Sequence, residues 1–272
     1  MSLPSGRGSF RIRAALLLLL LALVDYAPIL AGRVPFPADL LLQLPPYESV
    51  ADPRFVPRPH AEMWDLVTEM YPWKAYTRRA ALAATFPMWN PHLLLGTPFA
   101  GDPQPALFYP PTVLYAVLPT PLAWTLQFLL RTALAGLLVV LLAQALGAVG
   151  PAALLAGVVF AFCGWVTAFQ TRPHLDTVTW LALGLLAIDR LRRRPSGGAI
   201  ALTGVAFALP VLAGQPESAA HVTFAGLAFF LFRFAVPERE APGRLRFAGA
   251  FAAAGILALA LAAVQALPTL EF

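Results

Sequence analysis

Apolar runs of membrane-spanning length fill most of the chain after residue 121, and they constrain its fold more than any other feature. A helix needs about 20 apolar residues to cross about 30 Å of hydrocarbon. The composition agrees, because 59% of the 272 residues are hydrophobic and 12% are charged, whereas about a quarter are charged in soluble domains. The sequence therefore predicts an all-α polytopic membrane protein.

We expect seven transmembrane helices. Residues 1–13 form a basic N-terminus, residues 14–31 the first helix, and residues 122–267 six further helices before a short end at 268–272. The six are expected at 122–146, 151–169, 175–191, 198–213, 219–236 and 247–267. A cleaved signal peptide is the alternative for the first run, but no clear small-residue cleavage site follows it and many more spans come later.

The basic residues predict the orientation of these helices. They gather in alternate connections, at Arg190, Arg192, Arg193 and Arg194, and again at Arg233, Arg239, Arg244 and Arg246. Short cytoplasmic loops carry such an excess of Lys and Arg. We therefore expect a cytoplasmic N-terminus and an extracytoplasmic loop over residues 32–121. Because the bases record topology in this way, a nucleic-acid partner is not expected. A single cysteine, Cys163, excludes an intrachain disulfide and a cysteine-based metal site.

The long loop carries a pair of acids on a predicted interfacial helix. Asp65 and Glu69 are four residues apart, so they would share one face of a helix that starts near Ala61 and is ended or kinked by Pro72. Two carboxylates on one face could act as a general base and its helper, or hold a cation. A solvated helix face is the alternative.

Basic and aromatic residues follow Pro72. Trp73 and Tyr76 fall on one side of a helix, with Lys74 and Arg78 on another and Arg79 beside them. Such a helix is typical of the membrane interface, with its bases toward phosphates. These bases could bind a lipid-linked phosphate or ordinary headgroups.

The rest of the loop is rich in turn-forming residues, which predicts a stiff segment suited to a site. Its candidate binding side chains are Trp89, Asn90, Asp102, Gln104 and Tyr109. Trp89 and Tyr109 could stack on a sugar or anchor the chain at the headgroups.

Arg131 lies inside the second expected span. A charge at the centre of a span costs about 2.5 kcal/mol or more, so Arg131 should face a partner or a water-filled cavity. The alternative is an arginine that extends along its stem to the headgroups. The sequence leaves both open.

Several loop motifs resemble the bacterial YfhO-type family of multispanning membrane proteins. They are Asp65–Trp73, Pro87–Pro91, Gly96–Pro98, Asp102–Gln104 and Phe108–Pro111, with Gly214–His221 and Ala263–Glu271 further along. The family resembles GT-C glycosyltransferases, membrane enzymes that use polyprenyl-phosphate sugars and keep a catalytic acid in the first large outer loop. Two positions depart from the family pattern, since Glu69 stands where glutamine is expected and Gln215 where histidine is usual.

The resemblance implies a glycosyltransferase of the bacterial cytoplasmic membrane that acts on a cell-envelope glycan or protein. Asp65 would be the first choice for the general base and Asp39, nearer the first span, the second. Arg78, Arg79 or Arg131 would hold the lipid phosphate, and no cofactor or metal is implied. Family members are several hundred residues longer, so the resemblance also implies an N-terminal portion.

Two other classes of function stay open. A transporter or flippase of a lipid-linked precursor would use ionisable residues in or beside the spans, here Arg131, His174, Glu217 and His221. No inverted repeat is visible, although many transporters have one. A non-catalytic assembly protein would use the loop as a docking surface.

Overall fold

The computed structural model describes residues 5–56, 63–236 and 242–271, so the expected helix start at Ala61 and Arg239 lie outside the described residues. Regular structure within these ranges is helical apart from one two-stranded sheet. The main helices are α1 (Ser5–Asp25), α4 (Thr120–Ala145), α5 (Gly150–Ala161), α6 (Gly164–Phe169), α7 (Pro173–Arg193), α8 (Gly197–Leu212), α9 (Pro216–Ala235) and α10 (Arg244–Leu270). The predicted all-α class is confirmed for the described residues.

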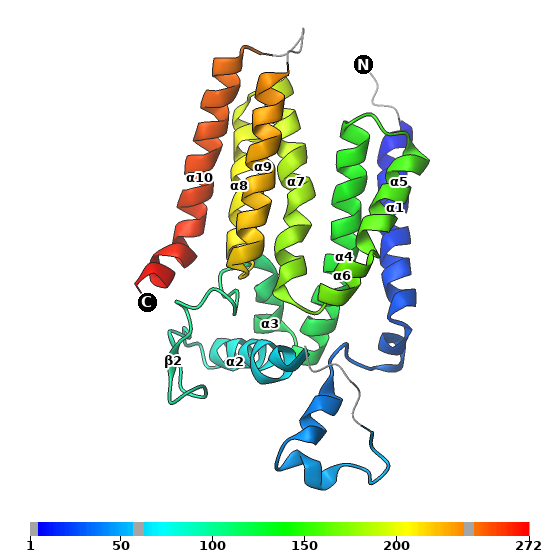
Figure 1. Cartoon of the computed structure of the whole chain (residues 1–272), viewed down its shortest axis with the longest axis vertical. Helices are drawn as coiled ribbons and strands as arrows, with labels where there is room; N and C mark the ends of the chain where they lie inside the picture. The colour runs from blue at the N-terminus through cyan, green and yellow to red at the C-terminus, as the bar shows by residue number, and fades with distance from the viewer. Residues whose placement is uncertain (1–4, 57–62, 237–241, 272) are drawn as a thin grey trace.

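The long helices run side by side in two groups, with α1, α4 and α5 in one and α7–α10 in the other (Figure 1). Helix α4 packs against α7 and joins the groups. Within the described ranges, three helices, α4, α9 and α10, are long and apolar enough to cross a membrane. Large side chains such as Phe224, Ile256 and Leu259 are 67–75% exposed on them, an apolar surface of the kind that lipid covers. These observations support membrane association, and the count of seven spans stays a prediction.

The predicted continuous helix over residues 151–169 is wrong. Helix α5 ends at Ala161, Cys163 has an extended backbone with ψ of 157°, and α6 starts at Gly164. Neither piece alone approaches the length of about 20 residues that crosses hydrocarbon. The apolar run therefore folds into two short helices.

Two glycines let α4 and α5 approach closely. A Cβ added at Gly157 would lie 2.6 Å from the carbonyl oxygen of Gly136, and one added at Gly136 would lie 3.0 Å from the carbonyl oxygen of Gly157. Small residues at a helix crossing bring two backbones together in this way. The small-residue bias of these segments thus has a packing role.

The segment between α1 and α4 gathers at one end of the bundle, opposite the connections that carry the arginine clusters (Figure 1). It comprises η1 (Ala27–Ala31), η2 (Ala38–Gln43), η3 (Tyr47–Val50), the π-helical turn η5 (Leu66–Met70), α2 (Tyr71–Leu82), β1 (Trp89–Asn90), β2 (Thr97–Pro98), η6 (Pro110–Thr112) and α3 (Val113–Val117). Pro72 lies in the first turn of α2, where a missing N–H does no harm. The helix therefore continues past Pro72, and the irregular π-helical turn directly precedes it.

This segment is fastened to both groups of helices. The indole nitrogen of Trp124 in α4 donates to the carbonyl oxygen of Pro35 at 3.0 Å, and the amide of Gln265 in α10 donates to the carbonyl oxygen of Ala100 at 3.1 Å. A buried cluster packs Trp73, Phe99 and Tyr115 of the segment against Trp124 of α4. The segment is thus part of the folded core.

Replacing Gly214 with alanine is expected to destabilise the protein by about 2–4 kcal/mol, because two costs add. Gly214 has φ of +89°, and a Cβ there would lie 2.4 Å from the carbonyl oxygen of Pro103. Denaturation in mixed detergent micelles measures the effect. Gly198→Ala, where nothing lies within 4 Å of the added Cβ, is the control and should not destabilise. Equal stability of the two variants would contradict close packing of α8 against the loop.

Candidate functional site

A cavity of about 710 Å³ lies between the end of α1, the chain that follows it and residues 54–56 and 63. This volume is in the range of small-molecule sites. Its aromatic walls are formed by Tyr26, Phe36 and Phe55. Prolines and aliphatic side chains form most of the remaining lining. Among the described residues, the charged ones that line it are Asp39, Arg33 and Arg54. The cavity therefore combines one acidic side chain, two basic side chains and aromatic walls.

The local sequence explains how this cavity forms. Gly32 has φ of +74° and ends η1 in a left-handed turn, so the chain folds back beneath α1. The next residues are fixed to α4 through Trp124, which binds Pro35 and packs edge-on against Phe36 with ring centroids 6.4 Å apart. Asp39 follows in the first turn of η2. The carboxylate is thus carried on a short helix that is anchored to a long one.

The two arginines of the cavity differ in their partners. Arg54 binds Asp52 through two hydrogen bonds of 2.8 and 3.0 Å, and its guanidinium lowers the pKa of the Asp52 carboxyl. The exposed Arg33 side chain has no hydrogen bond or ion pair with any described residue. Of the described residues that line the cavity, Arg33 is therefore the cation available to a ligand.

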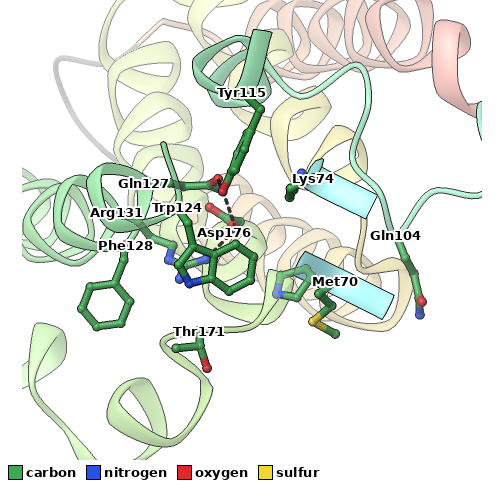
Figure 2. Close-up of a pocket in the computed structure, with 11 residues that line it drawn as sticks. Met70, Lys74, Gln104, Tyr115, Trp124, Gln127, Phe128, Arg131, Thr171 and Asp176 are labelled. Carbon is green, nitrogen blue, oxygen red and sulfur yellow. Dashed lines mark hydrogen bonds and ion pairs between the residues drawn. The ribbon is translucent and has the colours of Figure 1, made fainter. Parts of the chain in front are cut away.

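Figure 2 shows a buried polar network in which Gln127 and Arg131 of α4 lie beside Asp176 of α7. Arg131 forms an ion pair with Asp176 at 2.6 Å, and both side chains are 8% exposed. The Gln127 amide donates to Asp176 at 3.0 Å, and the Tyr115 hydroxyl donates to Gln127 at 2.7 Å. Arg131 also donates to the carbonyl oxygen of Gln170. Arg131 therefore faces a buried partner and does not extend along its stem to the headgroups.

The network encloses a second cavity of only about 30 Å³. That volume holds about one water and no sugar. Lys74 and Gln104 lie at its wall, and Thr171 lines both this cavity and the larger one. The two cavities are therefore neighbours, and the small one forms part of the interior.

Lys74 is buried and does not lie on an exposed basic face of α2. Its ammonium donates to the carbonyl oxygen of Pro105 at 2.7 Å and to the Thr112 hydroxyl at 3.3 Å, and it lies 5.3 Å from the Tyr115 ring centroid. Burial lowers the pKa of Lys74 to about 8, which the nearby Asp176 carboxylate partly opposes. The expectation that Lys74 faces membrane phosphates is therefore not met.

We compare the free energy of unfolding of the wild-type protein with that of a Lys74→Met variant. The wild-type value is expected to rise relative to the variant by about 2–3 kcal/mol between pH 7 and 10.5. Below pH 8 both the folded and the unfolded chain hold the Lys74 proton, and the folded chain bears the full cost of the buried charge. Between about pH 8 and 10.5 only the unfolded chain holds it, so stability increases with pH. Denaturation midpoints in mixed micelles across this range give the difference.

The control for this pH series is Arg79→Met. Arg79 is an exposed base of the same helix, with its guanidinium 5.9 Å from the Tyr76 ring centroid. The stability difference between wild type and Arg79→Met should stay constant with pH. A constant difference for Lys74→Met as well would show that Lys74 keeps its ordinary pKa.

Three of the acids predicted from the loop, Asp65, Glu69 and Asp102, lie outside the lining of both cavities. Asp65 is 39% exposed and lies 3.7 Å from the guanidinium of Arg172. The pKa of Glu69 is raised, first by burial and then by Asp65 and Asp102. Burial also raises the pKa of Asp102, although its carboxylate accepts a hydrogen bond from the backbone N–H of Gln104 at 2.9 Å. Among the residues that the structure describes, no cluster of three His, Cys, Asp or Glu side chains could hold a metal ion.

The turn-rich part of the loop is stiffened by its own side chains. Strands β1 and β2 pair antiparallel, and the Asn90 side chain accepts a hydrogen bond from the His92 amide at 3.0 Å. Trp89 is 52% exposed and its carbonyl oxygen accepts from the Tyr76 hydroxyl at 2.7 Å. The ring of Trp89 thus stays accessible to a ligand or to lipid.

The other predicted binding residues have structural partners. Tyr109 is 4% exposed and its hydroxyl accepts from the Trp180 indole at 3.0 Å, so it cannot stack on a ligand in this conformation. Arg78 donates to the carbonyl oxygen of Leu118. Tyr109 therefore connects the loop to α7, and Arg78 connects α2 to the end of α3.

The sequence interpretation missed the residues that complete both cavities. Asp176 carried a usable signal, because a carboxylate at the edge of an apolar run with an arginine in a neighbouring run suggests an ion pair. Arg33 carried no comparable signal, since a base next to a span end is common. Arg33 is a candidate only because it lines the same cavity as Asp39, and the turn at Gly32 brings the two residues there.

Comparison with protein-family models, with curated proteins and with solved structures finds no match to this chain.

Proposed function

We propose that the protein is a membrane glycosyltransferase that transfers a sugar from a polyprenyl-phosphate carrier to a cell-envelope acceptor on the outer face of the membrane. The observation that carries this proposal is the shared cavity of Asp39 and Arg33, which combines a carboxylate, a guanidinium with no polar partner among the described residues, and aromatic walls in about 710 Å³. Its place at the end of the helical bundle suits a substrate with a lipid tail and a polar head.

The proposed reaction is a direct displacement. The Asp39 carboxylate takes the proton of the acceptor hydroxyl, and the acceptor oxygen forms a bond to the anomeric carbon of the sugar. The bond from that carbon to the phosphate oxygen breaks, and the lipid phosphate departs with the electron pair. Arg33 stabilises the charge that develops on this phosphate. Aromatic rings such as Phe36 and Phe55 offer flat apolar faces to the sugar.

This assignment of roles differs from the first choice made from the sequence. Asp65 lies beside Arg172 and outside the cavity lining, whereas Asp39 lines the cavity. Arg131 is committed to Asp176 inside the protein. We therefore propose Asp39 as the base and Arg33 as the phosphate partner, with Asp65 as the alternative base.

The test uses the purified protein reconstituted in vesicles with radiolabelled polyprenyl-phosphate glucose, galactose or mannose. Isolated cell-envelope fractions are added as acceptor. Transfer of label from the organic to the aqueous or envelope phase supports the proposal. Movement of intact labelled carrier between leaflets without transfer would favour a flippase, and an unchanged carrier in every arm would contradict both.

A further inference from the structure

A second basic cavity lies at the end of the bundle opposite the proposed active site. Its volume is about 610 Å³, and it is formed where the N-terminal part of α1, the α4–α5 connection and the end of α7 come together. Three arginines line it, Arg11, Arg190 and Arg193. This cavity plays no part in the proposed reaction.

The charge of this cavity is positive and uncompensated by its own lining. None of the described residues that line it is a carboxylate. The nearest acid along α7, Asp189, already accepts from Arg193 at 2.9 Å and lies 2.9 Å from the guanidinium of Arg233. The cavity therefore attracts anions.

Hydrogen-bond donors remain available in it. The exposed Arg190 side chain has no hydrogen bond or ion pair with any described residue. Arg11 donates through Nε to Gln144 at 3.1 Å, which leaves its two terminal nitrogens. Helix α5 starts at Gly150 with no side-chain cap, so the positive end of its dipole lies at this cavity, although Pro151 in its first turn has no N–H to donate. Guanidinium groups and helix N-termini are the donors that phosphate oxygens prefer.

The surroundings favour a lipid over a free phosphate compound. Phe10, Leu141 and Leu186 form apolar walls beside the arginines. The cavity lies at the end of α4, a helix of membrane-spanning length, and therefore at headgroup depth. Basic pockets between helices at this depth bind anionic headgroups. We propose that this cavity binds the phosphate group of an anionic phospholipid, with Arg11 and Arg190 as its principal ligands.

Lipid binding is tested with the full chain in nanodiscs of phosphatidylcholine alone or with phosphatidylglycerol. Native mass spectrometry of the released protein counts bound phosphatidylglycerol, and a titration gives its apparent affinity. We expect saturable binding that falls about 5-fold for Arg190→Gln and for Arg11→Gln, and about 25-fold when both are replaced.

The matched control is Arg246→Gln. Arg246 is an exposed arginine at the same end of the bundle, lies outside the cavity lining and has no polar contact with any described residue. This variant has the same loss of charge and should keep its affinity within about 2-fold. Equal losses for Arg246→Gln and Arg190→Gln would overturn the proposal, because binding would then follow net charge alone.

Competition distinguishes the two sources of phosphate. Inorganic phosphate or glycerol phosphate at millimolar concentration should leave phosphatidylglycerol bound. Displacement by either would overturn the lipid assignment in favour of a soluble phosphate ligand. Failure of sugar transfer in the separate vesicle assay has no bearing on this outcome, since the two cavities lie at opposite ends of the bundle.

Discussion

Replacing Asp39 with asparagine is expected to lower sugar transfer about 10²–10⁴-fold, the usual contribution of a positioned general base. Asparagine keeps the shape of the side chain but cannot accept the proton of the acceptor hydroxyl. The amount of protein in the membrane and its melting temperature are measured alongside, so that the transfer rate is expressed per folded protein. Initial rates of label transfer in the reconstituted vesicles measure the effect.

Two further variants interpret this result. Glu48 is an exposed carboxylate in the neighbouring η3 with no side-chain contact among the described residues, so Glu48→Gln should retain full activity. Asp65→Asn tests the alternative base. If Asp65→Asn abolishes transfer and Asp39→Asn does not, the cavity that holds Asp39 is not the reaction site.

Replacing Arg131 with methionine is expected to destabilise the protein by about 3–5 kcal/mol, because Asp176 would remain buried without its counter-charge. The pair lies 2.6 Å apart and each side chain is 8% exposed, so the remaining carboxylate would have little access to bulk solvent. Denaturation in mixed detergent micelles at neutral pH measures the loss. Arg246→Met, at an exposed position, is the control and should change stability by less than about 0.5 kcal/mol.

The double variant Arg131→Met with Asp176→Leu separates the cost of an unpaired charge from the value of the pair. Two apolar side chains often replace a buried ion pair with little loss. The double variant should therefore recover most of the stability lost by Arg131→Met. A loss below about 1 kcal/mol in the single variant would contradict the buried position of the pair.

The helices from α7 to α10 could be predicted from the sequence to within a few residues. Their apolar runs are separated by prolines and arginine clusters, which are strong signals of helix ends and connections. The break between α5 and α6 could not be predicted in this way, because Phe162 and Cys163 continue an apolar run without a proline or a charge.

The candidate site could be predicted only in part. Asp39 was predicted as the second choice for the base from its position near the first span. Arg33 could not be predicted, because its place in the cavity depends on the turn at Gly32 and on the hydrogen bond between Trp124 and Pro35. Contacts over such sequence distances leave no local pattern. The same reason explains Lys74, which periodicity placed on a polar helix face and tertiary contacts with Pro105 and Thr112 placed inside.

The anchorage of the loop has a mechanical consequence. Trp124 holds the loop to α4 and Gln265 holds it to α10, at carbonyl oxygens of Pro35 and Ala100. Helices α4 and α10 belong to different groups of the bundle (Figure 1). Any sliding of one group past the other must therefore strain the loop that carries Asp39, and a ligand that stiffens the cavity would in turn resist that sliding.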